Sequence, residues 1–301
     1  MKIKTLKLAL FLFSLILMAC SDNDDNQAYG RLSVHLTDAP FPYDLVAEAN
    51  VTIFKIDARL KGGNEENTEN EESTEIEEST EEDIINEDNG SFVVLMEGEI
   101  TVNLLDLTNG VTQQLVDTEV PVGSYDLIRV HVEGVNVVLT SGQTYDLKVP
   151  SGSQSGIKIF LKPDLTITGG LSSDLLLDFD VSKSFVPKGG TDIESITGFN
   201  FKPVIKASHL STVGTLTGTV SELVEEVATG IEGAQVAIYD GDAQITSTFT
   251  DESGAYMVMG LEAGTYTLII EKEGYLTQTI EEINITPANK TTLDVELELS
   301  E

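Results

Sequence analysis

The chain has 301 residues and a formal net charge of −34, from 17 lysines and arginines against 51 aspartates and glutamates. So acidic a surface repels polyanions, which argues against nucleic-acid binding through phosphate contacts. A single cysteine excludes an internal disulfide, and the length allows about two domains of ordinary size.

The N-terminus has the features of an export signal in their usual order. Three lysines precede an apolar run over 8–18, which is too short to span a bilayer, since a spanning helix needs about 20 residues. Leu17-Met18-Ala19-Cys20 then resembles the lipobox of bacterial lipoproteins. The resemblance implies removal of residues 1–19 and acylation of Cys20, which would anchor the protein in the membrane. The alternative is an ordinary signal peptide with an accidental cysteine.

A polar segment over 20–29 predicts a flexible tether behind the lipid. Its beginning, with Ser21 followed by Asp22, Asp24 and Asp25, resembles the signal with which some bacteria place lipoproteins on the outer face of the outer membrane. A generic polar tether is the alternative. The sequence therefore predicts a lipid-anchored outer-membrane protein and leaves open whether it faces the cell exterior.

Residues 30–210 carry the alternation of apolar and polar residues that is typical of half-buried strands. We expect the following residues to point inward: Leu32, Val34, Leu36, Ile128, Val130, Val132, Leu175, Leu177, Phe179 and Val181. We expect the following neighbours to point outward: Arg129, His131, Glu133, Asp178 and Asp180. Many short strands separated by turn residues predict an antiparallel sandwich or barrel.

An acidic segment interrupts this region over 64–89, with 13 acidic residues and no basic one. It has too little apolar area to offset its chain entropy, and its charges repel one another. We expect a disordered loop inserted between two strands, because loop-closure entropy grows slowly with length. Weak calcium binding by this loop is the alternative, although the segment has no glycine to shape a calcium loop.

The first region resembles a bacterial lipoprotein domain of unknown function. The stretches that carry the likeness are GRLSVHLTDAP at 30–40, VPVGSYDLIRVHVEGVNV at 120–137, LLLDFDVSKSF at 175–185 and FNFKPVIKA at 199–207. The resemblance implies a β-sandwich-like exported module. It implies no chemistry, because none is assigned to that family.

The second region, from about residue 214, resembles the carboxypeptidase regulatory-like domain. The likeness rests on Gly218-Thr219-Val220, Gly233-Ala234-Gln235-Val236, Thr250-Asp251, Gly254-Ala255-Tyr256, Leu261, Gly264-Thr265-Tyr266 and Gly274-Tyr275. It implies a transthyretin-type sandwich in which Asp251 and the glycines shape turns, with carbohydrate-binding modules among the related folds. The segment 221–232 lengthens the first hairpin loop and departs from the family pattern.

The predicted fold is therefore all-β, with two antiparallel β-sandwich domains in tandem after a lipoprotein signal peptide. The predicted parts are the signal peptide over 1–19, the tether over 20–29, a β-rich domain over 30–210 and a regulatory-like sandwich over 211–301.

Catalytic motifs are missing from the sequence. His35, His131 and His209 form no zinc-binding pair, and we expect His35 and His131 to be exposed on strands. No nucleophile elbow, P-loop or dinucleotide-binding fingerprint occurs. The sequence therefore predicts a protein that is not an enzyme and needs no cofactor.

One constellation of carboxylates suggests a metal site. Asp178 and Asp180 share one face of a strand about 6.6 Å apart, and Asp38 could join them in a calcium site of oxygen ligands. The alternative is a solvent-facing strand whose charges discourage edge pairing.

These observations predict a non-catalytic, lipid-anchored envelope protein that binds a ligand or mediates adhesion, with glycan as the first ligand to test. The absence of tryptophan weakens the glycan hypothesis, since sugars stack on flat rings. The alternative is a scaffold that docks an outer-membrane protein partner. Its membrane contact would be the lipid on Cys20.

Overall fold

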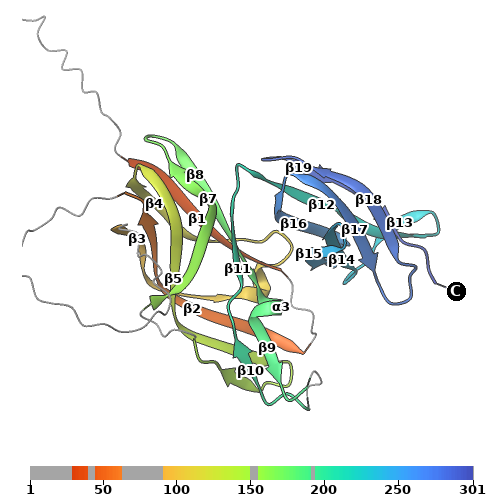
Figure 1. The fold of residues 1–301 in the computed structure, drawn as a ribbon. Helices are drawn as coiled ribbons and strands as arrows, with labels where there is room; N and C mark the ends of the chain where they lie inside the picture. Colours follow the sequence, from red (N-terminus) through yellow and green to blue (C-terminus); the bar gives the residue numbers. More distant parts are fainter. Residues whose placement is uncertain (1–28, 40–44, 63–90, 150–154, 191–193, 301) are drawn as a thin grey trace, which may run out of the picture.

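The computed structural model describes residues 29–39, 45–62, 91–149, 155–190 and 194–300. The predicted signal peptide over 1–19, Cys20, the tether up to residue 28 and the acidic insert over 64–89 lie outside the described residues. The described chain forms two β-sheet units that follow one another in sequence and lie side by side (Figure 1).

The first unit contains the strands β1 to β11 and two short helical turns. Their bounds are β1 Tyr29–Ala39, β2 Val46–Leu60, β3 Ser91–Asn103, η1 Leu104–Leu107, β4 Gln113–Pro121, β5 Gly123–Leu139, β6 Thr144–Asp146, β7 Ile157–Ile167, β8 Ser172–Asp180, α3 Val181–Ser184, β9 Phe185–Lys188, β10 Gly198–Phe201 and β11 Ile205–His209.

Two larger sheets and one small sheet enclose the core of this unit. One larger sheet has the strand order β3-β2-β5-β6, with β7 also paired to β5, and the other has the order β11-β8-β1-β4. The small sheet pairs β9 with β10. All ten residues that we expected to point inward are buried in this core. The all-β prediction is confirmed, but not all strand pairs are antiparallel. In this unit β1 and β8 run parallel, and in the second unit the short strands Lys290–Thr292 and Val295–Glu296 also run parallel to their neighbour.

The second unit has its own core between two further sheets. Its strands are β12 Val213–Val224, β13 Val227–Gly230, β14 Gln235–Asp240, β15 Ala243–Phe249, β16 Ala255–Glu262, β17 Gly264–Glu271, β18 Gln278–Ile285, β19 Lys290–Thr292 and β20 Val295–Glu296. One sheet has the order β13-β12-β16, with β19 and β20 also on β12, and the other has the order β15-β14-β17-β18. The core is separate from that of the first unit.

Turn chemistry explains two loops of this unit. The lengthened loop over 221–232 forms the hairpin β12–β13, whose two turn residues Glu225 and Glu226 both have positive φ, as a two-residue hairpin turn requires. Asp251 shapes the turn before β16, because its Oδ1 accepts hydrogen bonds from the backbone N–H groups of Ser253 and Ala255 at 2.9 and 3.0 Å. The predicted turn role of Asp251 is confirmed.

The loop after η1 joins the two units. The side chain of Asn109 donates from Nδ2 to the carbonyl of Ala255 at 3.1 Å, and its Oδ1 accepts from the N–H of Met257. These backbone groups belong to β16, which pairs with β12 on its other side. The Asn109 amide thus hydrogen-bonds two backbone groups at this edge of the sheet, which would otherwise be unpaired. Lys206 and Glu262 add an ion pair between the units at 3.3 Å.

Candidate functional site

Two of the three predicted metal-ligating carboxylates hold the chain at the start of α3. Asp38 Oδ1 accepts from the N–H of Val181 at 3.1 Å. Asp180 caps the helical turn, since its Oδ1 accepts from the N–H of Lys183 at 3.0 Å and from Ser182 Oγ at 2.6 Å. The Nζ of Lys183 lies 2.7 Å from Asp180 Oδ2. Both carboxylates therefore have a structural role in this turn.

The expectation that Asp178 and Asp180 face solvent is wrong. Their strand, β8, lies between β11 and β1 and is no sheet edge. The same face of β8 carries Leu176, which is fully buried although it lies outside the first core. A Cβ on Gly260 of β16 would lie 3.4 Å from the Leu176 side chain. The second unit thus covers the face that the alternation of the sequence assigns to solvent.

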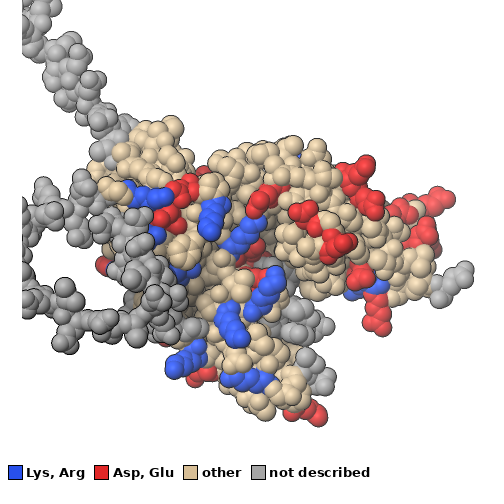
Figure 2. All heavy atoms as spheres, viewed as in Figure 1, with Lys and Arg blue, Asp and Glu red and all other residues tan. Residues whose placement is uncertain are grey.

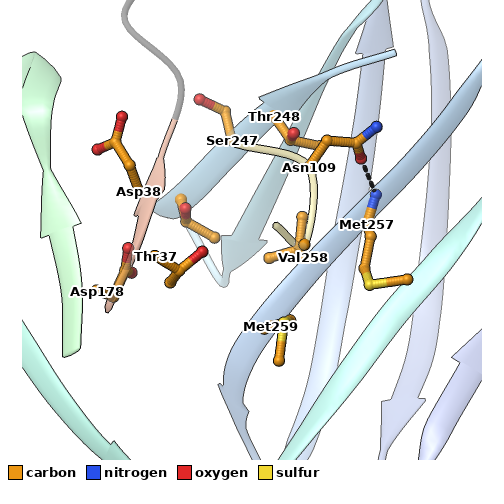
Figure 3. A pocket seen from close by; sticks show the side chains of 11 residues that line it. Thr37, Asp38, Asn109, Asp178, Ser247, Thr248, Met257, Val258 and Met259 are labelled. Atoms are coloured by element: carbon orange, nitrogen blue, oxygen red, sulfur yellow. Dashed lines mark hydrogen bonds between the residues drawn. The ribbon is translucent and has the colours of Figure 1, made fainter. Parts of the chain in front are cut away.

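Asp178 lines a small cavity between the units (Figure 3). The cavity has a volume of about 20 Å³, enough for about one water molecule. Thr37 and Asp38 line it from β1, and the second unit contributes residues of β15 and β16. Burial, and then repulsion by Asp180, raise the pKa of Asp178 to about 6, while Lys206 and Lys183 act in the opposite direction.

Calcium binding by Asp38, Asp178 and Asp180 stays a prediction of the sequence. Within the described ranges, no group of three or more His, Cys, Asp or Glu side chains is placed to hold a metal ion. At α3, Asp38 uses its Oδ1 to accept a backbone hydrogen bond. Asp180 uses both of its carboxylate oxygens, one to cap the turn and one to pair with Lys183.

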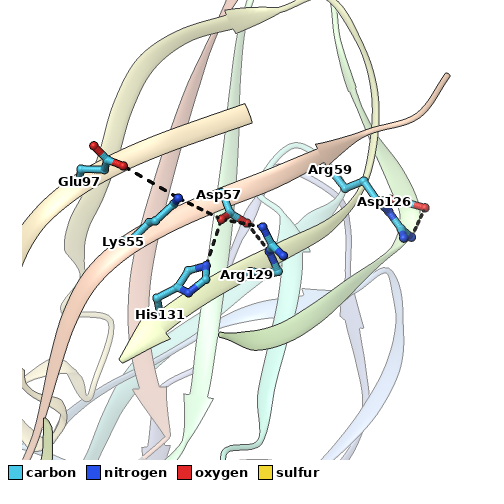
Figure 4. A network of polar contacts seen from close by, with 7 residues as sticks. All are labelled: Lys55, Asp57, Arg59, Glu97, Asp126, Arg129 and His131. Carbon is cyan, nitrogen blue, oxygen red and sulfur yellow. Dashed lines mark hydrogen bonds and ion pairs between the residues drawn. The ribbon is translucent and has the colours of Figure 1, made fainter. Parts of the chain in front are cut away.

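A second polar cluster lies on the outer face of the first unit, around Asp57 of β2 (Figure 4). Asp57 has only 1% of its surface exposed. Arg129 donates to its two oxygens from Nε at 2.6 Å and from Nη2 at 2.9 Å. His131 Nε2 lies 3.0 Å from Oδ2, and Lys55 Nζ lies 3.9 Å from the same oxygen. This cluster is a buried ion-pair network.

The prediction that His131 is exposed is wrong, because it is buried beside Asp57. Phe54 covers it, with a distance of 5.8 Å between ring centroids. The alternation does place Arg129 and His131 on one face, but the sequence alone did not reveal their partner. Asp57 stands directly opposite Arg129 across β2 and β5, in a register that includes irregularities after Thr52 and Ile53.

The histidines at 35 and 209 take no part in this network. His35 is half-buried on β1. His209 ends β11, and its Nε2 lies 3.1 Å from the carbonyl oxygen of Pro163. The geometry gives neither residue a catalytic partner in the part of the chain that is described.

A groove of about 440 Å³ opens on the second unit, at one end of the β15-β14-β17-β18 sheet. It is lined by Gly233, Gln235, Phe249, Glu271, Lys272, Glu273 and Thr277. Gly233 has a φ of +66°, and a Cβ there would lie 3.1 Å from Lys272 Nζ. The glycine therefore leaves room for the ammonium group against the backbone. Ring, amide, hydroxyl and charged groups line this shallow, open groove together.

Comparison with known protein families accounts for both units. Residues 29–203, more than half of the chain, match the family described as "Domain of unknown function (DUF4382)". The chain belongs to the DUF4382 family. In this member, residues 215–298 also match the carboxypeptidase regulatory-like domain. The two family resemblances predicted for the folded regions are thereby confirmed, whereas the lipobox stays a prediction. A comparison with curated proteins finds no match.

Solved structures give only distant likenesses to this DUF4382 member. A cohesin–X-dockerin complex from Acetivibrio cellulolyticus is 23% identical over 29% of this chain and 58% of that chain, with a TM-score of 0.24. The minor pilin of Streptococcus agalactiae is 10% identical over 89% and 96%, with a TM-score of 0.26. A shaft pilin variant from Lactobacillus rhamnosus GG is 10% identical over 91% and 100%, with a TM-score of 0.28. The chain thus spans 58% of the cohesin–dockerin chain, and scores this low support no argument about function.

Across the described ranges, no helix is both long enough and apolar enough to cross a membrane.

Proposed function

We propose that the protein is a non-catalytic, lipid-anchored protein of the bacterial outer membrane that binds a glycan through its second unit. The lipobox-like Leu17-Met18-Ala19-Cys20 supports the anchor. The groove on the second unit is the observation that carries the ligand-binding part of the proposal.

The chemistry of the groove suits a sugar. Phe249 is partly exposed and offers a ring against which the apolar face of a sugar can pack. Sugar hydroxyls both donate and accept hydrogen bonds. The groove matches them with Gln235 and Thr277, which do both, with the donor Lys272 and with the acceptors Glu271 and Glu273. A few fixed polar groups around an apolar surface are typical of ligand sites.

Phe249→Leu should weaken glycan binding by about fivefold, since a ring contact contributes about 1 kcal/mol beyond the area it buries. The measurement is a glycan array with the full chain in detergent, followed by calorimetric titration of each hit. Tyr239→Leu is the matched control, because this tyrosine lies on β14 outside the groove lining.

The glycan proposal fails if the wild-type chain binds no arrayed sugar above background. It also fails if both substitutions weaken binding equally. A stoichiometric protein partner found by crosslinking in membranes, with no glycan bound, would instead support the scaffold alternative.

Cys20→Ser should release the protein from the membrane fraction and abolish incorporation of labelled palmitate, because the thiol is the proposed acylation site. Fractionation and labelling of the producing bacterium measure both effects. Protease treatment of intact cells then tests orientation, with loss of the wild-type protein expected for exterior display. A Cys20→Ser variant that stays in the membrane and takes up palmitate would contradict the anchor.

A further inference from the structure

The charges of this acidic chain are divided unequally between its two units. Among the described residues, 29–209 hold 12 lysines and arginines against 16 acidic residues, whereas 213–300 hold two lysines against 16. The two units therefore carry formal charges of about −4 and −14. Figure 2 shows most of the positive side chains on the first unit, whereas the charged side chains visible on the second are mainly acidic.

The groove lies within the more acidic unit, and its own rim is acidic. Glu271 and Glu273 are exposed and flank Lys272 along the groove. The lining thus holds two carboxylates against one ammonium group, in a unit of strongly negative charge, which favours a ligand with a positive charge.

A simple counterion would not use the rest of the groove. Phe249 offers an apolar ring, and Gln235 and Thr277 offer directional hydrogen bonds that a small hydrated cation does not need. The combination suits a ligand with an apolar face, hydroxyl groups and a positive charge. A sugar that carries a protonated amine has all three.

We propose that the groove selects amine-bearing sugars, with Glu271 and Glu273 as the residues that recognise the ammonium group. This inference rests on the proposed glycan function and names the ligand class of the same site. Charge-assisted hydrogen bonds from the ammonium group to carboxylates are stronger than neutral ones, which gives the preference over an uncharged sugar. Lys272 opposes the preference, because its own ammonium group lies in the groove.

The test is calorimetric titration of the full chain in detergent with four probes, at a pH where the sugar amine is protonated. The probes are a glucosamine oligosaccharide, its N-acetylated counterpart, a glucose oligosaccharide of equal length, and spermidine as an amine without a sugar ring. We expect the glucosamine oligosaccharide to bind about tenfold more tightly than the N-acetylated one. We also expect its affinity to fall with added salt. Equal binding of the two oligosaccharides would overturn the inference, as would spermidine binding as tightly as the sugar.

Two double variants and one single variant test which charged residues produce the preference for the amine. The double variant Glu271→Gln/Glu273→Gln should lose the preference for the amine, and Lys272→Gln should increase it. The control Asp240→Asn/Asp242→Asn removes the same charge at the opposite end of the β14–β15 hairpin and should leave the preference intact. An equal loss in both double variants would show a general charge effect and overturn the site assignment. Neutral sugars that bind without any amine preference would overturn this inference and leave the glycan function standing, whereas no binding of any sugar would overturn both.

Discussion

Asp57→Ala should lower the free energy of unfolding by about 3–5 kcal/mol, because it leaves the positive charge of Arg129 partly buried without its carboxylate partner. Arg129 also lies 3.4 Å over the ring of Phe92, so its displacement would disturb β3 as well. Urea unfolding followed by circular dichroism measures the loss. The midpoint of the transition should fall while its slope is unchanged.

Asp117→Ala is the control for that experiment. Asp117 forms a two-pronged pair with Arg31, which has the same chemistry as the pair between Asp57 and Arg129 but lies on the surface. Surface ion pairs contribute little to stability, so this substitution should change the midpoint far less. Equal losses in the two variants would contradict the assignment of Asp57 to a buried network.

Asp178→Asn should stabilise the protein at pH 8 by about 1–3 kcal/mol, with the benefit disappearing toward pH 4. Burial raises the pKa of Asp178 to about 6, above its ordinary value of 3.8. The folded state therefore holds this proton more tightly than the unfolded chain. The destabilisation by the ionised carboxylate is fully present above pH 6 and is lost as the pH falls toward 3.8, and asparagine removes it.

The measurement is the melting temperature by calorimetry across pH 4 to 8 for the wild type and the variant. Asp174→Asn is the control, since Asp174 is exposed on the same strand. Its melting curve should follow the wild type at every pH. A constant offset of Asp178→Asn from the wild type at all pH values would contradict the role of burial.

The sequence predicts the core of the first unit well, because period-two alternation alone fixes which side chains share a face. Leu175, Leu177 and Phe179 are buried as that rule requires. Alternation says nothing about what covers the other face. Asp178 is half-buried and Leu176 fully buried because a unit encoded more than 30 residues later packs over β8.

Which side chains pair across neighbouring strands could not be predicted from the sequence either. The pairing of Asp57 with Arg129 joins residues 72 positions apart, and its register depends on strand irregularities that no local pattern announces. The groove residues come from three separate stretches, around Gly233, Phe249 and Lys272. Gly233 appeared in the sequence only as part of a family pattern, and its role beside Lys272 becomes visible only when the chain is folded.

The position of β1 has a mechanical consequence. This first described strand lies inside its sheet, parallel to β8 on one side and antiparallel to β4 on the other. The proposed anchor at Cys20 would pull on the beginning of β1. Any part of that force along the strand axis would load the hydrogen bonds of both neighbouring ladders together, whereas a strand peeled from a sheet edge loses its bonds one at a time. If the chain is anchored through Cys20 as proposed, β1 would therefore meet that force as an inner strand bonded on both sides and not as an edge strand.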